Sequence, residues 1–215
     1  MTTFSLKMLA VIAMLIDHSA EVIFNNNMTM RMIGRLAFPI YAFLIVEGFH
    51  KTRNKKKYLI RLALFAIISE LPFNLALHKG QLFYLDAQNV FFTLAIGLAM
   101  LMALERFKNS IYLSVLIIIT ACFYAETLHT DYSYRGILVI LFFELCRDCP
   151  LIRNISIMAV FMKIAYWFNG YASVALIPIS FYNEKKGPSC KYFFYCFYPV
   201  HLLILYFIAK KTGIY

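Results

Sequence analysis

The sequence predicts an all-α protein, a polytopic bundle of transmembrane helices that forms one domain over residues 1–215. Two observations predict this fold class. Hydrophobic residues make up 62% of the chain and charged residues only 15%, whereas a soluble domain is about 45–50% apolar and about 25% charged. The apolar residues also fall in successive runs, and no Ser-, Gly- or Pro-rich linker separates two halves. The chain therefore has too little polar surface for a soluble globule.

The apolar runs predict about nine spans, within a range of eight to ten. In chain order they cover residues 6–24, 31–49, 58–77, 89–105, 111–125, 136–146, 155–168, 172–182 and 192–209. The first four are close to the ~20 residues that cross a bilayer as a helix. Pro39 is expected to kink the second span because it interrupts the helical hydrogen bonds. The sixth, seventh and eighth runs are short, which suggests tilted or partly spanning helices.

Lys and Arg residues predict the orientation of the bundle. With the N-terminus inside, 13 of the 21 Lys and Arg residues fall in inner segments and five in outer ones. An excess of basic residues in cytoplasmic loops is the usual signal of membrane topology. We therefore expect a multi-pass protein of the cell (inner or plasma) membrane with a cytoplasmic N-terminus. The same signal accounts for the net charge of +10 without nucleic acid as a partner.

The first span carries polar residues that hydrocarbon does not tolerate without cost. Lys7 lies at its inner mouth, and His18 lies eleven residues further along. Eleven residues of helix rise roughly 16 Å and come back to within about 20° of the same face. Asp17 points about 100° away from His18, so the two side chains are poorly placed to pair directly. An ionisable residue at membrane depth indicates a functional site or an interhelical hydrogen bond.

Polar residues along the spans fall in two layers. The inner layer is basic and contains Lys7, Arg53, Lys55, Lys56, Lys57 and Arg61. The middle-to-outer layer contains His18, Arg35, Glu70, Asn89, Asp131 and His201. A basic mouth suits a cytosolic polyanion, and a histidine beyond it suits proton transfer because its pKa lies near neutral pH. Since the distance from Lys7 to His18 is roughly the reach of a phosphopantetheine arm, acyl-coenzyme A fits this outline.

Candidate roles follow from this layering, each beside a structural alternative. The catalytic candidates are His18, Glu70 and Asp17, and Glu70 could orient or charge His18. The candidates for cofactor binding are Lys7, Arg53, Lys57 and Arg61, which could instead snorkel or only set the topology. The candidates for acceptor binding are Arg35, Asn89, Asp131 and His201. Each has a structural alternative. Arg35, like Arg31, could form an ion pair with Glu47 or Glu70, and Asn89 could cap a helix. Asp131 could form a turn, and His201 could be a core histidine.

No metal site is predicted. Cys146 and Cys149 form a lone C-x-x-C, and neither a second pair nor a pair of histidines accompanies it. Structural zinc sites need four such ligands. The cysteines are therefore interpreted as packing residues or reduced thiols.

Several segments resemble the TraX family of membrane proteins. The segments "LKMLAVIAMLIDH", "RMIGRLAFPIYAFLIVEGFHKTRNKKKYLIRL" and "ISELPFNL" cover the first third of the chain, "NVFFTLAIGL" and "DYSYRGIL" extend the match to about residue 138, and "FYPVHLLIL" matches more loosely. TraX is associated with N-terminal acetylation of conjugative pilin. The family is similar to type-three acyltransferases and lysosomal glucosaminide acetyltransferases, in which a Lys or Arg precedes a His by eleven positions in the first span. Lys7 and His18 match that spacing, so the resemblance implies a catalytic His18 and cytosolic acetyl-coenzyme A as donor.

The sequence thus predicts an integral membrane acetyltransferase that uses acetyl-coenzyme A. The acceptor is an amine or hydroxyl of a peptide, sugar or lipid, and His18 acts as general base or as acyl carrier. Two other functions stay open at this point. Lys163, Glu70 and His201 could form the polar path of a small transporter or flippase, and the chain could be a non-catalytic component of a secretion assembly.

Overall fold

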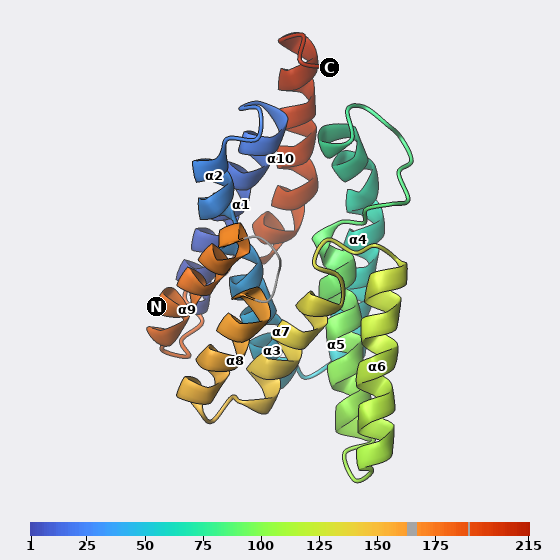
Figure 1. Ribbon diagram of the computed structural model, residues 1–215, viewed down its shortest axis with the longest axis vertical. Helices are drawn as coiled ribbons and strands as arrows, with labels where there is room; N and C mark the ends of the chain where they lie inside the picture. The colour runs from blue at the N-terminus through green and yellow to red at the C-terminus, as the bar shows by residue number, and fades with distance from the viewer. Residues whose placement is uncertain (163–166, 189) are drawn as a thin grey trace.

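The structure is a computed structural model that describes residues 1–162, 167–188 and 190–215. Its elements, coloured along the chain in Figure 1, are α1 (Thr3–Val22), α2 (Met28–Gly34), α3 (Ala37–Lys51), α4 (Lys55–Leu77), α5 (Val90–Arg106), α6 (Ile111–Thr127), α7 (Ser133–Leu145), α8 (Pro150–Met162), η1 (Trp167–Ala175), α9 (Leu176–Ser180) and α10 (Lys191–Lys211). The regular secondary structure of the described residues is helical, apart from one isolated bridge between Gln88 and Thr130. The all-α prediction is confirmed.

The helices confirm the apolar runs, but not the count of nine spans. Within the described ranges, four stretches are long and apolar enough to cross a membrane: α1, the continuous pair α2 and α3, α4 and α10. Shorter apolar helices are α6, α8 and the segment Gly170–Ser180. The fourth predicted span forms α5, which has 17 residues. The seventh predicted span, 155–168, lies partly outside the described residues, as does Lys163.

The second predicted span is interrupted just before Pro39. The second predicted span divides into α2, which ends at Gly34, and α3, which begins at Ala37. Pro39 lies in the first turn of α3, and it has no N–H to donate to the carbonyl of Arg35 four residues earlier. The helical hydrogen bonding is therefore interrupted at Arg35 and Leu36, although both residues keep right-handed helical dihedral angles.

Helix α3 lies near the centre of the bundle (Figure 1). It packs against α1, α5, α7, η1 and α9, while α4 packs between α5 and α10. Its side chains are mostly buried, including Phe38, Ile40 and Val46. Gly97 of α5 lets this helix approach α7 closely, because a Cβ there would lie 2.3 Å from Cδ1 of Ile140. Elements at the centre of such a bundle can hold polar groups away from lipid.

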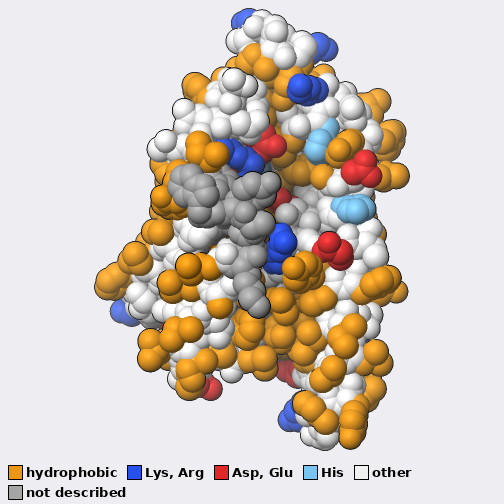
Figure 2. Space-filling view, in the orientation of Figure 1, with side chains coloured by type: hydrophobic (Ala, Val, Ile, Leu, Met, Phe, Trp, Pro, Cys, Tyr) orange, Lys and Arg blue, Asp and Glu red, His pale blue; other side chains and the backbone are white. Residues whose placement is uncertain are grey.

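The outer faces of several helices are apolar, as a lipid environment requires. Ile67 of α4 is 65% exposed and Ile119 of α6 is 60% exposed. Figure 2 shows hydrophobic side chains over much of the visible face, with charged and histidine side chains gathered mainly in its upper half. A soluble monomer rarely exposes apolar surface on this scale. The surface thus agrees with a membrane protein.

The chain's first residues are held by the segment that follows α9. The N–H of Thr3 donates to the carbonyl of Lys185 (2.8 Å), and the N–H of Phe4 donates to the carbonyl of Lys186 (3.2 Å). In return, the N–H of Asn183 donates to the carbonyl of Met1 (2.9 Å). These hydrogen bonds fix segment 182–188 beside the first turn of α1, where a large cavity opens.

Candidate functional site

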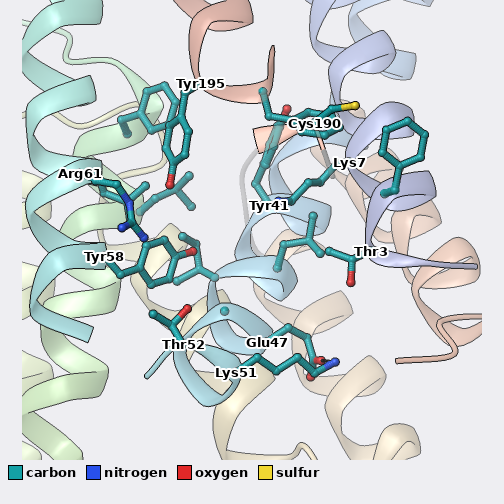
Figure 3. A pocket seen from close by; sticks show the side chains of 18 of the residues that line it. Thr3, Lys7, Tyr41, Glu47, Lys51, Thr52, Tyr58, Arg61, Cys190 and Tyr195 are labelled. Carbon is teal, nitrogen blue, oxygen red and sulfur yellow. Dashed lines mark ion pairs between the residues drawn. The ribbon is translucent and has the colours of Figure 1, made fainter. Parts of the chain in front are cut away.

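A cavity of about 400 Å³ opens among the N-terminal parts of α1, α4 and α10 and the C-terminal part of α3; we call it the basic chamber. Among the described residues, its charged lining consists of four cations and one carboxylate: Lys7, Lys51, Arg61, Lys186 and Glu47. Figure 3 shows Lys7 and Thr3 from α1 on one side of it and Tyr58 and Arg61 from α4 on the other. The excess of positive charge suits an anionic ligand.

Aromatic rings support the cations of the basic chamber. Nζ of Lys7 lies 5.3 Å from the centre of the Phe194 ring, and Cζ of Arg61 lies 5.8 Å from the centre of the Tyr58 ring. At these distances the ring faces attract the cations and hold their apolar stems. Lys7 and Arg61 were predicted as cofactor-binding residues, and the structure brings both to the same cavity.

A buried carboxylate, that of Glu47, forms ion pairs at the edge of the basic chamber. Glu47 is 6% exposed and pairs with Nζ of Lys51 (2.7 Å) and Nη2 of Arg147 (3.3 Å). Nζ of Lys51 also donates to the hydroxyl of Tyr182 (2.8 Å). These contacts connect α3 with segment 182–188 and with the residues after α7. The predicted pairing of Glu47 with Arg31 or Arg35 is therefore wrong, because its partners are Lys51 and Arg147.

Beyond the basic chamber, the rings of His18 and His201 form a stacked pair. Nδ1 of His18 and Nε2 of His201 are 2.8 Å apart, and the ring planes differ by 5°. Nδ1 of His201 lies 2.8 Å from the carbonyl oxygen of Phe197. His18 is 8% exposed and His201 is 4% exposed. Burial of this depth favours neutral rings over two facing imidazolium ions.

The hydrogen bonds of the pair determine where the protons lie when both rings are neutral. A carbonyl oxygen only accepts, so Nδ1 of His201 carries the proton that is donated to Phe197. Nε2 of His201 is then an acceptor, and Nδ1 of His18 must be the donor. This leaves Nε2 of His18 as a nitrogen with a lone pair. A fixed tautomer of this kind is what a general base requires.

His18 lines a second, smaller cavity of about 30 Å³, which we call the histidine pit. Its other polar lining residues are Asp17, Asp131 and the tyrosines 41, 132 and 198. In the part of the chain that the structure describes, the pit and the basic chamber share four lining residues, Met14, Tyr41, Val90 and Tyr198. We call these four residues the neck. A ligand in the basic chamber thus reaches to within one layer of side chains of the histidine pit.

Ion pairs around the histidine pit differ from those predicted. Arg31 pairs with Asp17 (3.1 Å) and with Glu21, rather than with Glu47 or Glu70. The sequence predicts that Asp17 does not pair directly with His18, and the contact of Asp17 with Arg31 agrees with this. Helix α2 can come this close to α1 because of Gly34, where a Cβ would lie 2.2 Å from Cβ of Asp17.

Arg35 lies beside the loop that precedes α7. It hydrogen-bonds the side chain of Tyr132 and acts electrostatically on Asp17 and Asp131. Asp131 is exposed but crowded by protein atoms. Incomplete hydration raises the pKa of its carboxyl to about 6, and Arg35 opposes this shift. The predicted pairing of Arg35 with Glu70 is not what the structure shows.

Glu70 was predicted to orient His18, and this prediction is wrong in the structure. Oε2 of Glu70 accepts from Nδ2 of Asn89 (2.5 Å), while the partner of His18 is His201. Asn89 also donates from Nδ2 to the carbonyl of Ala66 (2.8 Å) and accepts from the N–H of Phe91 (3.1 Å). The capping alternative for Asn89 is therefore confirmed.

The remaining candidates divide between the cavities and the surface. Of the four predicted acceptor-binding residues, Asp131 alone is among the described residues that line the histidine pit. His201 lies behind His18 instead. Arg53 and Lys57 are exposed and are not among the described lining residues of the basic chamber. In the part of the chain that the structure describes, no group of three or more His, Cys, Asp or Glu side chains could hold a metal ion.

Sequence reasoning missed three chamber and neck residues. Lys51 and Lys186 line the basic chamber, and Tyr41 belongs to the neck. Lys186 could not be found from the sequence, because it reaches the cavity through the tertiary contact of segment 182–188 with the N-terminus. Tyr41 was one of 15 tyrosines, and nothing in its local pattern distinguished it.

Helices with apolar outer faces, a basic inner cavity and a buried histidine pair define a helical protein of the membrane type with an internal polar site. The chain belongs to the TraX family, since the family model described as TraX protein matches residues 3–209. It is also similar to a probable fimbrial assembly protein FimC, serogroup H1, of Dichelobacter nodosus. That similarity amounts to 31% identity over 95% of this chain and 94% of the relative. In the comparison with solved structures, none matches.

Proposed function

We propose that this chain is an integral membrane acetyltransferase that moves an acetyl group from cytosolic acetyl-coenzyme A to an amine or hydroxyl acceptor. The observation that carries the proposal is the hydrogen-bonded pair of His18 and His201, which leaves Nε2 of His18 as a base in a pit next to the basic chamber. General bases of this kind accelerate reactions about 10²–10⁴-fold.

Acetyl-coenzyme A enters the basic chamber in this proposal. Its phosphates are held by cations such as Lys7, Arg61 and Lys186, which all line that cavity. The thioester extends along α1 towards the neck, over a helical rise from Lys7 to His18 of roughly 16 Å. The proposed orientation places the chamber on the cytoplasmic side of the plasma membrane, with the N-terminus inside.

Two chemical routes share this site. In the direct route, His18 takes a proton from the acceptor while the acceptor attacks the thioester carbonyl. In the covalent route, Nε2 of His18 attacks the thioester and carries the acetyl group to the acceptor. Both routes use the same nitrogen and end with acetylated acceptor and free coenzyme A.

The test compares two histidine variants of the purified protein. His18→Asn should lower the turnover of labelled acetyl-coenzyme A about 10²–10⁴-fold. His50→Asn is the matched control, since His50 is an exposed residue on α3 that pairs with Glu144. Both variants should elute as folded monodisperse protein in detergent. Equal turnover by His18→Asn and the wild-type protein would overturn the proposal.

A second candidate function is a non-catalytic part of a fimbrial assembly apparatus. It is favoured by the similarity to the relative from Dichelobacter nodosus, which is described as a probable fimbrial assembly protein. In that case His18→Asn would leave assembly unchanged in cells, and purified protein would not consume acetyl-coenzyme A. The same pair of variants therefore separates the two candidates.

A further inference from the structure

The neck between the two cavities contains two hydroxyl groups in an otherwise apolar layer. The side chains of Met14 and Val90 have no hydrogen-bond donor, whereas Tyr41 and Tyr198 each have a phenol. In the proposed function, the acetyl group has to reach this layer to come within range of His18. The carbonyl of the thioester therefore comes to lie beside the tyrosines of the neck.

The hydroxyl of Tyr198 already has a structural role. Tyr198 is 2% exposed, and its hydroxyl hydrogen-bonds the backbone N–H of Val90 at the start of α5. An N–H in the first turn of a helix has no carbonyl partner within that helix. The ring of Tyr198 also packs edge-on against His18, with ring centres 5.9 Å apart, and against Phe91, with ring centres 5.0 Å apart. Tyr198 is thus held in place as a helix cap and as a packing residue.

Tyr41 differs from Tyr198, because its hydroxyl has no hydrogen-bond partner among the described residues. The residue lies in the first half of α3, is half-buried and lines both cavities. Figure 3 shows it on the side of the basic chamber away from Lys51 and Glu47. A phenol can donate one hydrogen bond. The proton of Tyr41 is therefore available to a ligand that enters the neck.

Acyl transfer needs a donor at the place where negative charge develops. When a nucleophile attacks a thioester, the carbonyl oxygen gains an electron pair and becomes an oxyanion. His18 does not supply this donor, because its Nε2 has the lone pair that takes the proton or attacks the carbon. The donor must come from a second group that faces the same space as His18. Tyr41 meets this condition, since it lines the histidine pit together with His18.

We propose that the hydroxyl of Tyr41 donates a hydrogen bond to the thioester carbonyl oxygen of acetyl-coenzyme A and stabilises the oxyanion that forms there. The assignment rests on the proposed function and adds a catalytic residue to it. The two residues then divide the chemistry between them. His18 acts on the proton or takes up the acetyl group, and Tyr41 binds the oxygen.

Tyr41 keeps its proton throughout the reaction. The nucleophile, which is the acceptor in the direct route and Nε2 of His18 in the covalent route, forms a bond to the carbonyl carbon, and the C=O electron pair moves to the oxygen. That pair then re-forms the C=O bond while the C–S bond breaks and the sulfur leaves with the bonding electrons. The acceptor proton reaches the sulfur by way of His18 in the direct route and through water in the covalent route.

The kinetic test removes the hydroxyl alone. Tyr41→Phe should lower kcat about 10²–10³-fold, as the loss of one oxyanion donor does. The KM for acetyl-coenzyme A should rise at most about tenfold, because the hydrogen bond to the uncharged carbonyl is weaker. Tyr112→Phe is the matched control and should behave as the wild type, since Tyr112 is 86% exposed on α6 and lies outside the described linings of both cavities. Both variants should unfold near the wild-type temperature in detergent.

A binding test detects the hydrogen bond without turnover. It uses two unreactive analogues: a ketone in which a CH₂ group replaces the thioester sulfur of acetyl-coenzyme A, and S-ethyl-coenzyme A, which has no carbonyl. With ¹³C at the ketone carbon, the infrared carbonyl band should move to lower wavenumber on binding to the wild-type protein. This shift should be absent in Tyr41→Phe. S-ethyl-coenzyme A should bind both proteins with the same affinity within about twofold, because it makes no hydrogen bond to Tyr41.

The outcomes distinguish this assignment from the proposed function. The assignment is overturned if Tyr41→Phe retains the wild-type kcat, or if the ketone band is the same in both proteins. It is also overturned if the variant weakens binding of both analogues equally, because Tyr41 would then act through packing. The proposed function itself fails if His18→Asn retains turnover or if the wild-type protein consumes no acetyl-coenzyme A. In that last case the ketone band still decides whether Tyr41 binds a carbonyl oxygen.

Discussion

Replacement of His201 tests whether the hydrogen bond between the two histidines determines which ring nitrogen of His18 carries the proton. In His201→Leu the residue keeps an apolar shape of similar length but loses the nitrogen that lies 2.8 Å from Nδ1 of His18. Stranding one buried N–H costs about 1–3 kcal/mol. His18 avoids this cost when the proton moves to Nε2, which is the wrong tautomer for a base at the pit.

The size of the effect follows from that free energy. A preference of about 1–3 kcal/mol corresponds to roughly a five- to 150-fold change in the population of the active tautomer. We therefore expect kcat to fall by that factor in His201→Leu. The KM for acetyl-coenzyme A should stay within about twofold, since His201 lies outside the described lining of both cavities. His201→Gln keeps an acceptor oxygen and should recover part of kcat.

The assay is steady-state consumption of labelled acetyl-coenzyme A by the purified variants, with thermal unfolding in detergent as a control for folding. A His201→Leu protein that unfolds near the wild-type temperature and retains wild-type kcat would refute the argument. Equal loss of kcat in the Leu and Gln variants would also count against it, because packing rather than the acceptor atom would then explain the loss.

Two further predictions concern the chamber and its support. Lys7→Gln and Arg61→Gln should each raise the KM for acetyl-coenzyme A several-fold, which corresponds to about 1 kcal/mol of binding free energy, and the effect should be smaller in high salt. Arg53→Gln is the control in the same titration and should leave that KM unchanged, because Arg53 is exposed and lies outside the described chamber lining. Asn89→Ala removes the cap of α5 and a donor to the backbone of α4, so it should lower the free energy of unfolding by about 2–3 kcal/mol in denaturation measurements without altering the KM.

The fold class was predictable because it depends on averages along the chain. Apolar runs must become helices in a membrane, since each helix satisfies its own backbone hydrogen bonds. The break in the second run was predictable from one residue, Pro39, whose chemistry is local. The number of spans was less accessible. Helices such as α7 and α8, with 13 residues each, are shorter than a bilayer requires.

The sequence predicted which polar residues belong to the site, but not which of them contact one another. Depth along a helix follows from residue number, so Lys7, His18 and Arg61 could be assigned to layers. Rotation and neighbours depend on packing between helices, which no single segment encodes. His18 was therefore given Glu70 as a partner of opposite charge, although it bonds His201, which is 183 positions away in sequence.

The unequal sizes of the two cavities bear on the choice between transfer and transport. A transporter moves its whole solute across the barrier, so at some stage of alternating access the closed connection must widen to the size of that solute. Here one cavity has about 400 Å³ and the other about 30 Å³. A transferase needs only the acetyl group to pass between them, while the bulky donor stays in the basic chamber. The neck of Met14, Tyr41, Val90 and Tyr198 then has to admit only the acetyl group and not the rest of the donor.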